Sequence, residues 1–165
     1  MKITSHHLYY VCTLILLAMW IPVSLDKILH FELFKNAMIQ QPFNDRIGLL
    51  LAYILPFFEW SIVVLLLMPS LRRYGFLLSS FLMLLFTCYV ALAIIASPDN
   101  LPCGCGLVFQ HLSWEVHLVL NSIFLLISLL GLLLEKHIVL RNCRDLASTK
   151  NNSNDINLPK KNLGF

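Results

Sequence analysis

Charge is scarce in this sequence. Charged residues make up 13% of the 165 residues, about half the share expected of a soluble globular domain, and hydrophobic residues make up 58%. The Walker A loop, the glycine-rich dinucleotide fingerprint, the HExxH zinc motif and the GxSxG nucleophile elbow are all missing from the sequence. The common soluble enzyme classes therefore have no motif support, and the composition indicates a membrane protein.

Positions 74–134 contain no basic residue and include long apolar runs. A run of about 20 apolar residues is long enough to cross a bilayer as a helix. The first such run in the chain exceeds the apolar core of a secretory signal and lacks a small-residue cleavage site, so we expect it to be retained. The sequence predicts an all-α polytopic membrane protein, a four-transmembrane-helix bundle. The expected spans are residues 8–25, 47–68, 75–96 and 114–134.

Residues 26–46 mix charged and apolar side chains. Leu29, Phe34 and Met38 recur near helical spacing, which predicts an amphipathic helix at the membrane surface between the first and second spans. Pro42 is expected to end this helix.

The chain divides by charge into a membrane domain, residues 1–135, and a tail, residues 136–165. The tail holds six Lys and Arg against two Asp and Glu, so the formal net charge of +3 belongs to it. We expect a basic, largely disordered cytoplasmic tail beside the anionic leaflet, with residues 148–165 unstructured. A charge confined to a tail also argues against a nucleic-acid partner.

Lys and Arg concentrate on the cytoplasmic side of membrane proteins. Placing both termini in the cytoplasm puts nine of the twelve basic residues inside and leaves Lys27, Lys35 and Arg46 outside. Residues 97–113 then form an outer loop. We therefore expect a multi-pass protein of the bacterial inner membrane with this loop in the periplasm.

Two of the five cysteines, Cys103 and Cys105, lie in this loop within the sequence Pro-Cys-Gly-Cys-Gly. A disulfide between cysteines one residue apart closes a small, strained ring, and strained disulfides exchange readily. The start of the next helix is expected to favour a thiolate. One alternative is a structural turn with incidental cysteines. Another is a metal site with His111 and His117, although this is not a standard zinc spacing.

Polar residues inside spans are costly and are therefore functional candidates. Glu59 follows Pro56 in the second span; it either bonds backbone groups freed by the proline, or exchanges protons or contacts a quinone. In the fourth span, His117, Asn121 and Ser128 share one helix face. His117 is either a packing residue or a base and proton carrier for thiol chemistry.

Several short motifs occur in one order along the chain. They are Asp26-Lys27 before an aromatic-rich surface helix, Leu55-Pro-x-x-Glu59, Pro69-x-x-Arg72-x-x-Gly75, Phe86-Thr87-x-Tyr89, and Pro102-Cys-x-Cys-Gly followed by Leu112-Ser-Trp-x-x-His117. With these motifs, residues 8–134 resemble the MauE/DoxX group of redox-associated membrane proteins. The resemblance implies periplasmic disulfide formation or cofactor maturation beside thioredoxin-like partners. It implies that Cys103 and Cys105 are the redox pair, and that Glu59 and His117 occupy recurring polar positions.

Quinone-coupled four-helix oxidoreductases such as the vitamin K epoxide reductase group carry a C-x-x-C pair and a second outer pair. This sequence has no second outer pair. The difference favours one of two roles. Either the Cys103 and Cys105 pair exchanges directly with a partner and with a lipid-soluble acceptor, or the protein has an assisting role in a larger complex.

The favoured interpretation is an inner-membrane thiol-disulfide redox protein whose expected catalytic residues are Cys103, Cys105, His117 and Glu59. Its expected partners are the lipid bilayer and a thioredoxin-like or other periplasmic protein. A quinone is the candidate cofactor, and no metal is expected. The alternative is a non-enzymatic membrane subunit that docks and stabilises a partner complex through the glycine-rich loop.

Overall fold

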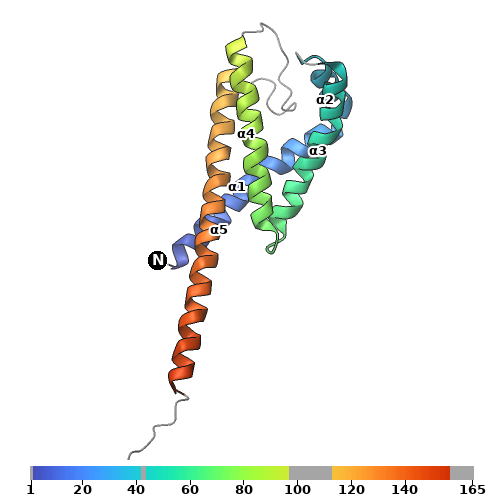
Figure 1. The fold of residues 1–165 in the computed structure, drawn as a ribbon. Coiled ribbons are helices and arrows are strands. Elements are labelled where there is room, and N and C mark those ends of the chain that lie inside the picture. Colours follow the sequence, from blue (N-terminus) through green and yellow to red (C-terminus); the bar gives the residue numbers. More distant parts are fainter. Residues whose placement is uncertain (1, 42–43, 97–112, 157–165) are drawn as a thin grey trace, which may run out of the picture.

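The computed structural model describes residues 2–41, 44–96 and 113–156 (Figure 1). These residues are helical apart from short connections, and no strand occurs among them. Four of the helices are long and apolar enough to cross a membrane, which confirms the all-α fold with four candidate spans. The helices are α1 (Lys2–Leu29), α2 (Phe31–Ile39), α3 (Asp45–Leu67), α4 (Arg72–Ala96) and α5 (Trp114–Ile156).

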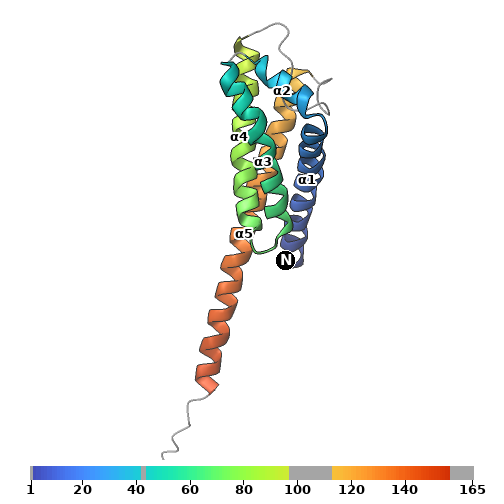
Figure 2. The same cartoon turned by 90° about the vertical axis from the view of Figure 1, so that its right-hand side faces the viewer.

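The four long helices form a bundle, and the short helix α2 lies at one end of it (Figure 2). α1 packs against α3 and α5, and α4 packs against the same two helices, most extensively against α5. Large apolar side chains remain exposed along all four long helices. Such a surface suits lipid rather than water, as expected of membrane spans.

Hydrogen bonds between small and aromatic residues tie the spans together inside the bundle. The Trp20 indole Nε1 of α1 donates to the Ser79 hydroxyl of α4 over 2.9 Å. The hydroxyls of Ser80 on α4 and Ser128 on α5 lie 2.6 Å apart. Small polar residues let membrane helices approach closely and bond across the interface. Ser79 and Ser80 on α4 therefore serve helix packing.

The amphipathic helix predicted between the first two spans is present as α2. Its apolar face buries Phe34 and Met38, while Glu32 and Lys35 form an ion pair of 2.5 Å on its exposed side. Its start differs from the prediction, because α1 continues to Leu29 instead of ending near residue 25. Nothing between positions 26 and 29 breaks a helix, so these residues extend the first span.

The fourth span also extends beyond its predicted end at residue 134, since α5 continues to Ile156. The sequence has no proline or glycine between Gly131 and Ile156, so nothing in it interrupts the helix. Residues 148–156, expected to be unstructured, are therefore helical. The rest of the predicted disordered tail, 157–165, lies outside the described residues.

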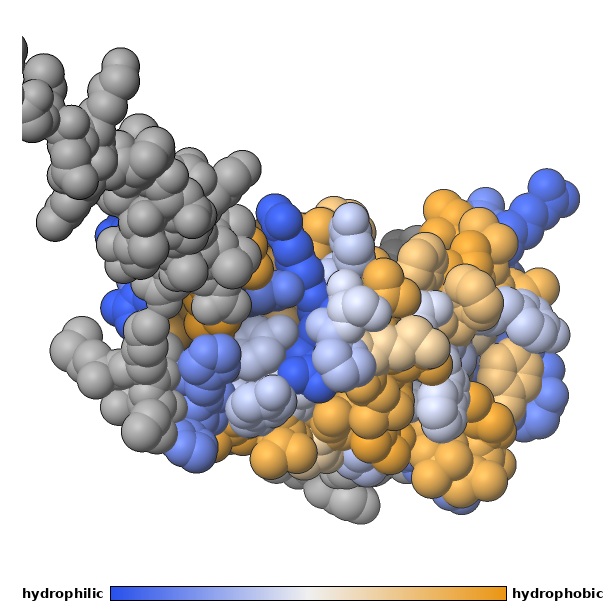
Figure 3. Space-filling view, turned by 90° about the horizontal axis from the view of Figure 1, so that it is seen from below, coloured by the Kyte–Doolittle hydropathy of each residue, from blue (hydrophilic) through white to orange (hydrophobic). Residues whose placement is uncertain are grey.

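The end of the bundle opposite α2 carries the start of α1, the turn between α3 and α4, and the continuation of α5 (Figures 1 and 2). Seen from this end, hydrophilic residues gather in a band and hydrophobic residues cover the flank (Figure 3). In the turn, Arg72 Nε donates to the Leu66 carbonyl over 2.9 Å, and its guanidinium stacks on Tyr9 and Tyr10. The arginine thereby holds the start of α1 against the turn.

Candidate functional site

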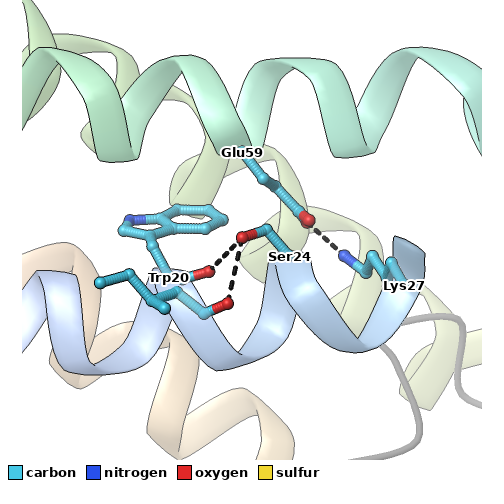
Figure 4. A network of polar contacts seen from close by, with 5 residues as sticks. Trp20, Ser24, Lys27 and Glu59 are labelled. Atoms are coloured by element: carbon cyan, nitrogen blue, oxygen red, sulfur yellow. Dashed lines mark hydrogen bonds and ion pairs between the residues drawn. The ribbon is translucent and has the colours of Figure 1, made fainter. Parts of the chain in front are cut away.

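A buried ion pair joins α1 to α3 inside the bundle (Figure 4). The Lys27 ammonium donates to Oε1 of Glu59, and the two side chains are 1% and 0% exposed. Taking two charges out of water is expensive, and a carboxylate or ammonium inside a membrane normally has a partner of opposite charge. The predicted candidate Glu59 therefore has a partner that the sequence analysis had placed in a surface segment after the first span.

The prediction that Lys27 belongs to a segment on the membrane surface is wrong, because α1 extends its buried face as far as this residue. Trp20, Ser24 and Lys27 follow one another at helical spacing on the face of α1 turned toward α3 (Figure 4). All three are buried, and the Ser24 hydroxyl donates to the Trp20 carbonyl over 2.7 Å. This spacing was visible in the sequence and could have shown that the lysine continues the buried face of the first span.

Two aromatic rings complete the surroundings of the Lys27 ammonium. Its nitrogen lies 5.2 Å from the ring centroid of Phe34 on α2 and 5.6 Å from that of Phe86 on α4. Aromatic faces attract cations at such distances. Helices α1, α2, α3 and α4 thus all contribute side chains to this site.

The second carboxylate oxygen of Glu59, Oε2, is buried and has no hydrogen-bond partner among the described residues. Because Oε1 bonds Lys27, the carboxylate does not bond the backbone near Pro56, which was one of its two predicted roles. A buried polar atom without a partner is rare in native structures and calls for an explanation.

Gln41 and Tyr89 form a polar contact between the chain just after α2 and α4. The Tyr89 hydroxyl donates to Oε1 of Gln41, whose Nε2 donates to the Ala37 carbonyl over 2.9 Å. Tyr89 lies three residues after Phe86, one turn closer to the end of α4 at which α2 lies. This contact joins the residues just after α2 to α4 and so holds α2 at the end of the bundle that contains the ion pair.

His117 and Asn121 line a cavity of about 20 Å³ between α1 and α5. Both residues and Ser128 are buried, which confirms that the three share an inward face of α5. Asn121 Nδ2 has no partner among the described residues. The cavity has room for one water molecule, which would satisfy this amide. Ser128 instead bonds Ser80 and serves helix packing.

The cysteine pair Cys103 and Cys105, together with His111, lies outside the described residues. The chain leaves α4 at Ala96 and enters α5 at Trp114, both at the end of the bundle where α2 lies (Figure 1). His117 is therefore in the first turn of the helix that follows the pair. We expected the start of the next helix to favour a thiolate at the cysteine pair. The field of a helix start fades beyond its first turn, and α5 starts at Trp114, nine residues after Cys105, so this expectation loses its support.

Within 2–41, 44–96 and 113–156, no three His, Cys, Asp or Glu side chains are grouped to hold a metal ion. An apolar groove of about 720 Å³ between α4 and α5 includes Tyr74 and Ser80, but Ser80 already bonds Ser128 and the Phe76 carbonyl. The groove begins at the turn between α3 and α4, at the end of the bundle opposite α2.

Comparison with known proteins identifies one family. The family described as methylamine utilisation protein MauE matches residues 5–134, which include three spans, most of the fourth and the sequence of the cysteine pair. No curated protein and no solved structure matches the chain.

Proposed function

The chain belongs to the MauE family, and we propose that it is an inner-membrane thiol-disulfide redox protein that uses Cys103 and Cys105. The family takes its name from methylamine utilisation, and we place the role of this chain in processes related to it. The observation that carries the proposal is the Cys-Gly-Cys sequence between α4 and α5, because a pair one residue apart favours exchange over stapling.

The proposed exchange conserves electrons and atoms. A thiolate of a thioredoxin-like or other periplasmic protein attacks Cys103 Sγ of the Cys103–Cys105 disulfide, and Cys105 leaves as a thiolate. The second partner thiolate then attacks the partner sulfur of this mixed disulfide and releases Cys103. The partner gains a disulfide and the pair gains two electrons, and the reverse sequence reduces the partner.

His117 is the proposed proton carrier for this exchange. Thiols must lose a proton before they attack, and leaving thiolates take one up. Histidine changes charge near neutral pH, and this one lies in the first turn after the cysteine loop. The cavity it shares with Asn121 offers space for a water molecule beside the imidazole.

A trapping experiment tests the proposal. In the direction that reduces the partner, the Cys103 thiolate attacks a partner disulfide, and Cys105 then attacks Cys103 Sγ and releases the partner. Cys105→Ser removes this second step, so a mixed disulfide through Cys103 should accumulate. Cys103→Ser should accumulate much less. Cys103 follows Pro102 and is farther from α5 along the sequence than Cys105, so we expect it to be the more accessible sulfur. The complexes are resolved on non-reducing gels, and the attached protein is identified by mass spectrometry.

Cys88→Ser is the matched control, because Cys88 is an exposed free cysteine on a span. It should trap nothing and leave exchange unchanged. Equal trapping by Cys103→Ser and Cys105→Ser would contradict the assigned roles. No trapping by either variant would favour the docking subunit, whose binding does not depend on oxidation state.

A further inference from the structure

We propose that Lys27 and Glu59 form an intramembrane proton-exchange site, in which Oε2 of Glu59 takes up and releases the proton while Lys27 holds Oε1. The use of this proton rests on the proposed thiol chemistry. The proton exchange itself stands on the geometry of the pair.

Packing alone does not account for the pair. Both side chains are buried within apolar helices, and no part of either charge reaches solvent. Replacing a buried ion pair by apolar residues of similar volume is often neutral or stabilising, so such a pair is weak evidence for a stabilising role. Ionisable residues at such positions in membrane proteins commonly mark proton or ion pathways.

The two carboxylate oxygens differ in their surroundings. Oε1 accepts from the Lys27 ammonium, whereas Oε2 is buried without a partner among the described residues. Adding a proton to Oε2 gives a neutral carboxylic acid whose Oε1 still accepts from the ammonium. The site therefore gains and loses one proton without breaking the contact between α1 and α3.

Aromatic rings stabilise the positive charge of Lys27 in addition to Glu59. The rings of Phe34 and Phe86 lie within cation–π distance of its nitrogen, from α2 and α4. When Glu59 becomes neutral, the ammonium keeps these attractive contacts. This arrangement suits a carboxylate that is protonated and deprotonated repeatedly beside a fixed positive charge.

The other titratable groups near this end of the bundle have contacts of their own. On α1, Asp26 bonds His30 over 3.0 Å. On α4, Tyr89 bonds Gln41, and on α5, His117 lines the small cavity. Among the described residues, the side chains shown to contact the pair from α2 and α4 are aromatic hydrocarbons. The proton is therefore assigned to Glu59.

The site serves the proposed exchange as a proton store. Oxidation of two thiols to a disulfide releases two protons as well as two electrons. When a partner disulfide oxidises the Cys103–Cys105 pair, both electrons and both protons end on the partner's two thiols. We assign to Glu59 the transient holding of one of these protons until a partner thiolate takes it up, while the other proton passes to the second partner thiolate, and the reverse order applies when the pair is reduced. No electron passes through the Lys27–Glu59 pair.

Infrared spectroscopy of the purified full-length protein in lipid bilayers tests the proton exchange directly. A buried carboxyl group that takes up a proton gives a carbonyl stretching band that rises as pH falls. We expect this band in the wild type and its loss in Glu59→Gln. Glu135→Gln is the matched control, because Glu135 Oε2 is also buried without a partner among the described residues; this variant must keep the Glu59 band. Absence of a band that depends on Glu59 between pH 4 and 10 overturns the proposal.

The double variant Lys27→Met/Glu59→Met separates proton exchange from a structural contact. Both charges vanish together, so no unpaired buried charge remains, and we expect normal abundance and helix content. The carbonyl band should disappear, and the rate of thiol-disulfide exchange should fall at least tenfold. Adding Cys105→Ser to the double variant should still trap the partner. Exchange at the wild-type rate would overturn the proposed use of this proton in thiol exchange, whereas the infrared band decides the proton site itself. A band that depends on Glu59 without any trapping would instead refute the thiol chemistry and leave the proton site standing.

Discussion

Gly131 on α5 marks the closest approach to the Phe76 ring on α4. A Cβ atom at this glycine would lie 2.1 Å from Cε1 and 2.5 Å from Cδ1 of that ring. Phe76 is completely buried among core residues, so its ring has no free space to move into. The absence of one side chain thus sets how closely the two most extensively packed helices approach.

Gly131→Ala should therefore destabilise the bundle. Overpacking of this kind typically costs about 1–3 kcal/mol in the free energy of unfolding. Unfolding in detergent measures it, with Leu130→Ala as the neighbouring control on the exposed face. Adding Phe76→Leu to Gly131→Ala should recover part of the loss, because the smaller side chain makes room. Strict additivity of the two changes would show that the ring and the glycine do not interact.

At the scale of elements, α2 depends on a small-residue surface of α3. Gly48 and Ala52 lie one turn apart, and Phe34 and Met38 of α2 pack on this surface. A Cβ atom at Gly48 would lie 2.5 Å from the Met38 carbonyl oxygen, which belongs to the backbone and cannot rotate away. The seating of α2 also positions Phe34 against the Lys27 ammonium.

Gly48→Ala should loosen α2 without unfolding the spans. We expect amide hydrogen exchange to accelerate about tenfold or more across Phe31–Ile39 and to stay unchanged in α4 and α5. Leu50→Ala, on an exposed face of the same helix, is the control and should leave α2 protected. Unchanged exchange in Gly48→Ala would mean that α2 tolerates the added methyl group and that its close contact with α3 is dispensable.

At the scale of the whole molecule, the start of α1 and the continuation of α5 lie at the same end of the bundle (Figure 2). The cysteine loop joins two helix ends at the opposite end (Figure 1). Because Lys and Arg concentrate toward the first end, we propose that this end faces the cytoplasm and that the loop faces the periplasm.

Cysteine labelling tests this orientation in a background with Cys12→Ser and Cys88→Ser. After mild reduction of intact cells, an impermeant thiol reagent should modify Cys103 and Cys105, and Cys143 should react only after lysis. Modification of Cys143 alone would invert the orientation. Exchange with a periplasmic partner would then be excluded, because the pair would face the reducing side of the membrane.

The sequence predicted which segments form apolar spans, which segment forms an amphipathic helix, and which residues share the polar face of α5. All three depend on local periodicity. His117, Asn121 and Ser128 follow helical spacing within one apolar run, and all three are buried. The partner of Glu59 depends on how α1 packs against α3, and nothing local specifies a contact between residues 32 positions apart. Helix ends were misjudged for a related reason: charges at residues 26 and 27 favoured an exposed segment, whereas the interior pairing keeps Lys27 in the helix.

The length of α5 has a practical consequence for experiments. Its 43 residues rise about 1.5 Å each, so the helix is roughly 65 Å long, about twice the hydrocarbon thickness of a bilayer. The candidate span within it stops at Arg141, and the remaining helix projects about 20 Å farther. A fluorescent or affinity tag fused after Ile156 would therefore clear the lipid headgroups without an added linker, at a distance from the cysteine loop that leaves partner exchange undisturbed.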